Sequence, residues 1–192
     1  KGKMSPGDIQ WMKTGRGIIH SEMPAMSDGK LLGFQLWINM PASMKMNKPK
    51  YEYIKSNQKT KFEDKDKKIN LIAGKFESIE GPVKGHNVDP IYFDIELKAN
   101  RKINLTVPET HNSFVYLLKG DLKIGSEKHE NISDSTLVLL KRGSALKILA
   151  NKESKFLFIA GKPIGEPIAR GGPFVMNTKA EILQAIQDFN NG

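Results

Sequence analysis

The chain has 192 residues, of which 39% are hydrophobic and 27% charged, and it carries a formal net charge of +9. Because there is no cysteine, disulfides, thiolate metal sites and cysteine nucleophiles are excluded, and any metal must be held by histidine, aspartate, glutamate or water. The sequence has neither an apolar run long enough for a membrane span nor a signal-peptide pattern. We therefore expect no membrane association and a cytoplasmic location, or a nuclear one in a eukaryote.

The positive charge raises the question of nucleic-acid binding. Only four of the 30 basic residues are arginines, although phosphate and guanine recognition favours the guanidinium group. The lysines concentrate instead between Lys45 and Lys75. We interpret this stretch as a solvated linker or loop, with a non-specific electrostatic contact as the alternative. Direct nucleic-acid binding is not expected.

The first elements of the chain combine a turn with a possible metal-binding strand. Ser5–Asp8 reads Ser-Pro-Gly-Asp, which predicts a turn. If residues 18–22 form a strand, His20 and Glu22 leave the same face of the sheet. An imidazole and a carboxylate side by side can bind a divalent transition metal. His-x-Glu pairs also occur by chance, and a complete site needs three or four protein ligands, so the pair alone leaves both interpretations open.

The rest of the chain shows mainly the patterns of β-strands. Period-two alternation predicts strands over residues 34–40, 91–97 and 103–107, and apolar runs predict strands buried on both faces over 114–118, 137–140 and 156–159. Lys119–Asp121 can close a hairpin. Residues 45–68 have little apolar patterning and are predicted to separate two β units. Short strands with glycine-rich turns are typical of an all-β sandwich or barrel.

One helix is predicted, at the C-terminus. Thr178 and Glu181 form a capping-box pattern, and Ile182, Ile186 and Phe189 fall on one face at helical spacing. We expect this face to pack against a barrel, with docking of a partner as the alternative.

Three long motifs carry a resemblance to a known family. They are SPGDIQWMKTGRGIIHSEMP at 5–24, GFQLWINMPASMKMNKPKYEYI at 33–54 and GGPFVMNTKAEILQAIQDF at 171–189. In this order they resemble the pirins, and the similarity extends over essentially the whole chain. Pirins are bicupins, so the resemblance implies an all-β fold of two tandem cupin (double-stranded β-helix, jelly-roll) barrels and a C-terminal helix. It implies three regions: 1–68, the end of a first, metal-binding barrel plus a lysine-rich linker; 69–165, a second barrel; and 166–192, a return segment and helix.

The resemblance also implies a metal site. Pirins hold a metal, usually iron, with three histidines and one glutamate, and their His-x-Glu motif matches His20 and Glu22. We therefore expect both as ligands of Fe(II) or another divalent transition metal. In the family the other two ligands form a His-x-His motif on an earlier strand. This sequence starts too close to Pro6 to contain that strand, so we expect an incomplete first barrel and weak metal binding by the chain alone.

The second barrel is expected to be metal-free, as the resemblance implies for pirins. Superposing the ligand pattern on it selects Thr106, Pro108 and Asn112, which are poor ligands, and residues 145–149 add no histidine or carboxylate. His111 is then a turn or pocket residue.

Two functions of different classes follow from the resemblance. One is a quercetin 2,3-dioxygenase that uses the metal to open the ring of a flavonol, with Glu22 as ligand, as base for the substrate hydroxyl, or as both. The other is a non-enzymatic, redox-sensitive transcription co-regulator that binds an acidic protein partner. A cupin acting on an unknown substrate is a third.

Overall fold

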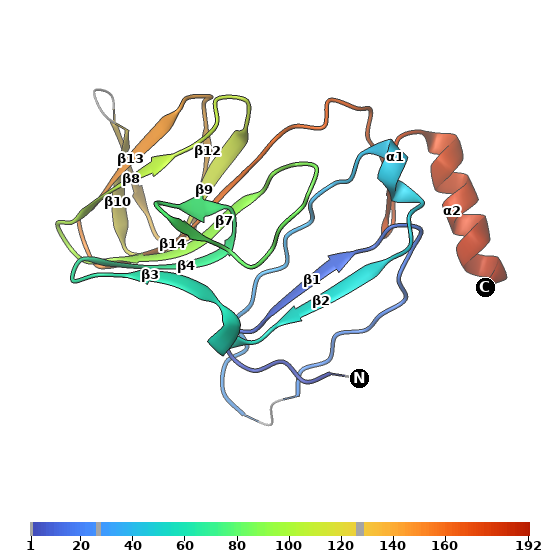
Figure 1. Ribbon diagram of the computed structural model, residues 1–192, viewed down its shortest axis with the longest axis horizontal. Helices are drawn as coiled ribbons and strands as arrows, with labels where there is room; N and C mark the ends of the chain where they lie inside the picture. Colours follow the sequence, from blue (N-terminus) through green and yellow to red (C-terminus); the bar gives the residue numbers. More distant parts are fainter. Residues whose placement is uncertain (1, 26–27, 126–128) are drawn as a thin grey trace. The chain divides into compact units, whose positions relative to one another are not determined.

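The computed structural model describes residues 2–25, 28–125 and 129–192, which form two compact units (Figure 1). Unit 1 comprises Lys1–Ser5, Gln10–Tyr53 and Ile164–Gly192, and unit 2 comprises Pro6–Ile9 and Ile54–Pro163. Neither of the two α-helices in the described part of the chain has the length and hydropathy to span a membrane.

Unit 2 is built from two antiparallel sheets. The larger has the strand order β12 (Thr136–Leu140), β9 (Asn112–Lys119), β14 (Ser154–Gly161), β7 (Ile91–Leu97), β4 (Lys67–Ala73) and β3 (Thr60–Glu63). The smaller has the order β11 (His129–Ser133), β10 (Asp121–Gly125), β13 (Ala145–Ala150) and β8 (Lys102–Thr106). A short hairpin of β5 (Lys75–Phe76) and β6 (Ile79–Glu80) and a 3₁₀ turn, η1 (Ser56–Gln58), complete the unit.

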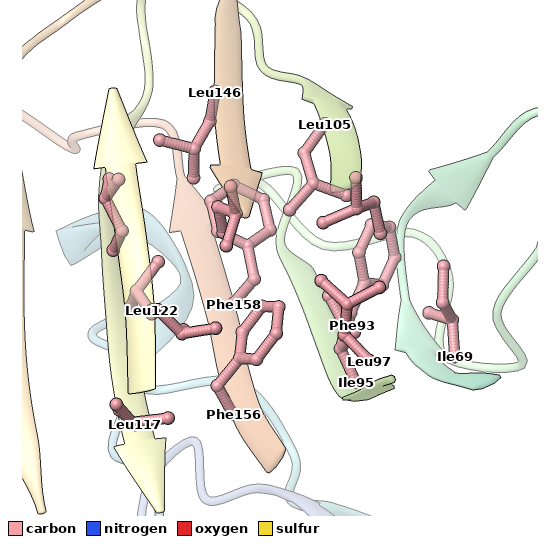
Figure 2. Packing of buried hydrophobic residues seen from close by; sticks show 14 of the residues in the cluster. Ile69, Phe93, Ile95, Leu97, Leu105, Leu117, Leu122, Leu146, Phe156 and Phe158 are labelled. Atoms are coloured by element: carbon pink, nitrogen blue, oxygen red, sulfur yellow. The ribbon is translucent and has the colours of Figure 1, made fainter. Parts of the chain in front are cut away.

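The hydrophobic core of unit 2 lies between the two sheets. Along β7 every second side chain, from Ile91 to Leu97, is buried. Figure 2 shows Phe93, Phe156 and Phe158 of the larger sheet facing Leu105 and Leu122 of the smaller one. The rings of Phe93 and Phe158 have centroids 6.2 Å apart, and both side chains are almost fully buried. Burial of these apolar side chains is what holds the two sheets face to face.

Five of the six predicted strands are present, and they confirm the all-β fold class. They are β7, β8, β9, β12 and β14, which cover the predicted 91–97, 103–107, 114–118, 137–140 and 156–159 to within about two residues. The turn at Pro6–Gly7 is also present, with Gly7 at φ +83°.

Strand β12 departs from the expectation that both faces are buried. Leu137 is 55% exposed and Leu139 is 78% exposed. The reason is that β12 is the edge of its sheet, so its outward side chains have a neighbouring strand on one side only.

The predicted hairpin at Lys119–Asp121 is wrong, because the two strands that flank it belong to different sheets. Gly120, at φ +116°, marks the corner where the chain passes from β9 to β10. An added Cβ there would overlap Ser154, so the corner needs glycine both for its backbone angle and for the close approach of β14.

The strand predicted over 34–40 is also wrong, because this stretch is irregular. Trp37 is 55% exposed, and the Met40 amide donates to the Asn39 side chain at 2.9 Å rather than to a neighbouring strand. Alternation alone does not form a strand when the backbone finds local partners instead. Conversely, the lysine-rich stretch is not a loop throughout, since it contains β2 (Lys50–Ile54), η1, β3 and β4.

Unit 1 consists of short elements joined by long irregular segments. Its elements are the β1 (Ile9–Lys13)–β2 ladder, helix α1 (Ala42–Lys45), the hairpin β15 (Ala169–Gly171)–β16 (Phe174–Met176) and helix α2 (Lys179–Asn191). The predicted capping box is confirmed, because the Glu181 amide donates to Thr178 Oγ1 and Glu181 bonds back to the Thr178 amide. Helix α2 packs on the β15–β16 hairpin, with Ile182 against Gly171 and Phe189 against Phe174.

We predict that Phe158→Ala lowers the free energy of unfolding by about 3–5 kcal/mol, because it leaves a cavity between the sheets of unit 2. The control Leu139→Ala removes an exposed side chain from β12 and should change the same quantity by about 0.5 kcal/mol or less. Urea titration of both variants measures the difference. Equal losses would contradict the placement of the core.

Candidate metal centre

The predicted ligands His20 and Glu22 lie on an irregular segment that follows β1. The segment starts with a turn in which the Gly17 amide donates to the Thr14 carbonyl at 2.9 Å and the Arg16 amide to the Asn47 carbonyl at 3.0 Å. Gly15 has φ +51°, and a Cβ there would overlap the Asn47 carbonyl oxygen, so this turn requires glycine. Residues 18–22 then continue without strand structure. A strand here was the condition for His20 and Glu22 to leave the same face, and that condition is not met.

Both side chains are accessible to a metal ion as ligands. His20 and Glu22 are exposed, and neither forms a hydrogen bond or ion pair with another described residue. Across residues 2–25, 28–125 and 129–192 no group of three or more histidine, aspartate or glutamate side chains could hold a metal ion. Among the residues described, the pair thus has no third partner, and its role as a ligand pair remains a prediction.

The remaining histidines lie in unit 2. His111 is 4% exposed; its Nε2 lies 3.0 Å from the Asp89 carbonyl oxygen, and its Nδ1 lies 3.3 Å from Thr110 Oγ1. These contacts give it a structural role after the β8–β9 turn. His129 is exposed on β11, and His86 is half-buried in the loop before β7.

The three residues of the second barrel that match the positions of the family's metal ligands lie at the rim of this barrel rather than in its core. Thr106, Pro108 and Asn112 are all exposed at the ends of β8 and β9. The described interior between the sheets is filled by hydrophobic side chains, which offer no metal ligands. That this barrel binds no metal remains an expectation.

Sequence reasoning missed a buried lysine in unit 1. Lys45, the last residue of α1, is 5% exposed. Its Nζ donates to Asn39 Oδ1 at 2.6 Å and to the Val175 carbonyl of β16 at 3.1 Å. Burial lowers the pKa of Lys45, and the carboxylates of Glu166 and Glu181 oppose that shift. The many lysines between Lys45 and Lys75 favoured a solvated loop. No local sequence pattern distinguishes Lys45 from the exposed lysines beside it.

Around Lys45, carboxylates and amides connect the elements of unit 1. One oxygen of Glu166 accepts from the Ala42 amide at 2.8 Å, at the start of α1, and from Asn177 Nδ2 at 2.9 Å. The Asn177 amide donates to Glu181 at 3.0 Å, at the start of α2. The network therefore fixes α1, β16 and α2 to one another.

Comparison with known proteins places these features in a family. The model of the Pirin family matches residues 1–38, which include His20 and Glu22, and the model of the Pirin C-terminal cupin domain matches residues 92–192. A pirin-like protein of Caulobacter vibrioides is 36% identical over 100% of this chain and 69% of its own length. The chain belongs to the pirin family.

Two further relatives carry names of an activity. A candidate quercetin 2,3-dioxygenase of Pseudomonas aeruginosa is 36% identical over 100% of this chain and 69% of its own length. The crystal structure of a quercetin 2,3-dioxygenase from Acinetobacter baumannii superposes with a TM-score of 0.87 at 31% identity, covering 98% of this pirin chain and 67% of that chain. The chain thus spans about two thirds of the length of these relatives, and its cupin fold agrees with the resemblance seen in the sequence.

We predict that Lys45→Met lowers the free energy of unfolding by about 1–3 kcal/mol, because Asn39 Oδ1 and the Val175 carbonyl lose their buried donor. Lys48→Met, at an exposed position of the same stretch, should change it by about 0.5 kcal/mol or less. Urea titration, with hydrogen exchange of the α2 amides to report on unit 1, measures both. Lys45 has no structural role if the two variants behave alike.

The lowered pKa of Lys45 also predicts that the free energy of unfolding depends on pH. Because burial lowers the pKa of Lys45 in the folded protein, the unfolded chain holds more protons between that lowered pKa and 10.5. The stability of the wild type relative to Lys45→Met should therefore rise as the pH increases toward 10.5. The comparison is made by urea titration at a series of alkaline pH values. A flat or falling difference would contradict the burial of the ammonium group.

Proposed function

We propose that this pirin is a metal-binding cupin that catalyses the quercetin 2,3-dioxygenase reaction on flavonol-like aromatic substrates, with His20 and Glu22 as two of the metal ligands. The observation that carries the proposal is the superposition, over nearly the whole chain, on a structure named for that activity. The match of residues 1–38 to the Pirin family model supports the choice of ligands. We place the protein in the cytoplasm, consistent with a chain that has no cysteine.

The donor chemistry of the pair fits Fe(II) or a similar divalent ion. A neutral imidazole and a carboxylate are among the ligands that such ions take, in sites that leave positions open for substrate. Both side chains are exposed and unbonded within the described part of the chain, so neither has to give up a partner in order to bind. Since a site of this kind needs three or four protein ligands, the pair is a partial set.

The surroundings of the pair suit an aromatic ligand. Ile19 is 87% exposed and Met23 is 81% exposed, and these residues flank His20 and Glu22 in the sequence. Apolar side chains next to polar donors are the usual composition of a small-molecule site. Contact with a flat aromatic ring would remove both side chains from water, and this gain favours binding.

The chain's own residues have distinct parts in this reaction. A bound divalent metal would supply Lewis acidity and electron transfer. Glu22 would accept the proton of the substrate hydroxyl at a carboxylate oxygen, and His20 would hold a neutral imidazole toward the ion. Ile19 and Met23, which flank the pair in the sequence, would supply apolar contact to the substrate.

A non-enzymatic role is the alternative, in which the protein is a redox-sensitive transcription co-regulator or another protein-binding module. The Caulobacter relative is named only as pirin-like, and the net charge of +9 suits an acidic partner. This alternative predicts a complex that depends on the oxidation state of the metal, without turnover.

We predict that His20→Ala and Glu22→Ala each lower the metal content of the protein after iron loading at least about tenfold. Quercetin-dependent oxygen uptake should fall with it. The control is His129→Ala, which removes an exposed histidine from β11 and should leave both quantities unchanged. Elemental analysis and an oxygen electrode provide the measurements.

The two readouts separate the alternatives. Metal retained at the wild-type level in both ligand variants would refute the ligand assignment. Metal lost in the variants, with no oxygen uptake even in the wild type, would refute the dioxygenase and favour the protein-binding role.

A further inference from the structure

The outer face of the smaller sheet of unit 2 carries three lysines around one leucine. In the β10–β13–β8 register, Leu149 of β13 lies opposite Lys123 of β10 on one side and opposite Lys102 of β8 on the other. The strand residues next to these positions are buried in the core (Ile103, Leu122, Ile124, Ile148 and Ala150), so alternation directs the three side chains outward. Neighbouring strands lie about 4.8 Å apart, which places the two lysine Cα atoms about 10 Å from each other across Leu149.

The third lysine stands on β13 itself. Lys147 precedes Leu149 by two positions and so shares its face, about 7 Å along the strand. It lies opposite Asn104 of β8. We call Lys102, Lys123 and Lys147, with Leu149 at their centre, the lysine face. Lys102 and Lys147 are exposed, whereas Lys123 and Leu149 are half-buried.

The charges of the lysine face are not neutralised within unit 2. None of its three lysines forms an ion pair or hydrogen bond with another described residue. Its outward neighbours Asn104 and Asn131 are neutral. Two acidic residues stand on the described strands of the same sheet. Asp121 lies at the end of β10, where it accepts from Asn151 Nδ2 at 2.6 Å, and Glu130 of β11 lies opposite the core residue Ile124 rather than opposite a lysine.

Two lysines of the larger sheet form ion pairs. Lys155 Nζ lies 3.1 Å from Glu96 and 3.8 Å from Asp94, and Lys67 Nζ lies 2.6 Å from Asp64. Other lysines of the larger sheet, such as Lys61 and Lys119, have no ion pair with a described residue either. The lysine face differs because its three lysines surround one leucine and no acidic residue lies opposite any of them in the register.

We propose that the lysine face docks an acidic segment of a partner protein, in which an apolar residue is flanked by carboxylates. Three lysines at spacings of about 7–10 Å complement carboxylates spaced along an extended or helical segment, and Leu149 provides apolar contact between them. Nucleic acid fits less well, because no arginine stands on β8, β10 or β13 to make bidentate phosphate or base contacts. The surface lies on unit 2 and uses neither His20 nor Glu22, so it stands independently of the proposed dioxygenase activity.

The test compares two charge-reversal variants of the full chain that have the same net charge. One is K102E/K123E/K147E on the lysine face, and the other is K65E/K98E/K162E at exposed lysines elsewhere in unit 2. The probe is a fluorescein-labelled peptide of alternating glutamate and leucine, and fluorescence anisotropy gives its Kd. A third variant, K102Q/K123Q/K147Q, removes the charge without reversing it in case the first does not fold, and circular dichroism checks the fold of all three.

We expect the lysine-face variants to raise the Kd at least about tenfold and the control variant to raise it less than about threefold. Equal losses in the lysine-face and control variants would overturn the proposal, because binding would then follow net charge alone. It would also be overturned if an oligothymidine of equal charge, or vesicles containing phosphatidylserine, bound the wild type more tightly than the peptide through the same three lysines. Absence of peptide binding to the wild type at low salt would overturn it as well.

Discussion

Closure of two antiparallel sheets over one hydrophobic core is the constraint on which unit 2 depends. Because alternation sends every second side chain inward, the residues of β7 and β8 are divided between a filled interior and a more exposed outer face. The interior is occupied by side chains such as Phe93 and Phe158 and contributes stability rather than chemistry. Recognition by this unit therefore has to take place on the outer faces of its sheets or at its rim.

Unit 1 follows a different principle. Its elements are short, so polar interactions have a larger part in fixing them. Lys45 is buried and donates to Asn39 and Val175, while Glu166 and Glu181 bond the first residues of the two helices. A buried ammonium group is costly unless its partners are well placed, and this requirement fixes the spacing of α1 and β16. The segment that carries His20 and Glu22 is attached to this unit by the Gly15 turn, whose amides bond to Asn47 and Thr14.

Local sequence patterns predicted the strands of unit 2 well, but they predicted the irregular segments and the polar network of unit 1 poorly. Strands such as 91–97 were predictable because the alternation that identifies them is the same feature that buries them. Residues 34–40 have a similar pattern but no strand partner among the described residues, and pairing is a long-range property that a local pattern does not contain. The corner at Gly120 and the burial of Lys45 likewise depend on residues distant in the sequence, Ser154 and Val175. For the metal site, the choice of His20 and Glu22 came from the family resemblance, since the strand geometry first used to argue for it is absent.

The most direct test of the central claim, that His20 and Glu22 are metal ligands, is anomalous diffraction from crystals of the protein loaded with iron, recorded at the iron absorption edge. The account predicts an anomalous peak within coordination distance of a ring nitrogen of His20 and a carboxylate oxygen of Glu22, about 2.0–2.2 Å for ligands of this kind. A peak coordinated by other residues, with His20 and Glu22 left in solvent, would contradict it.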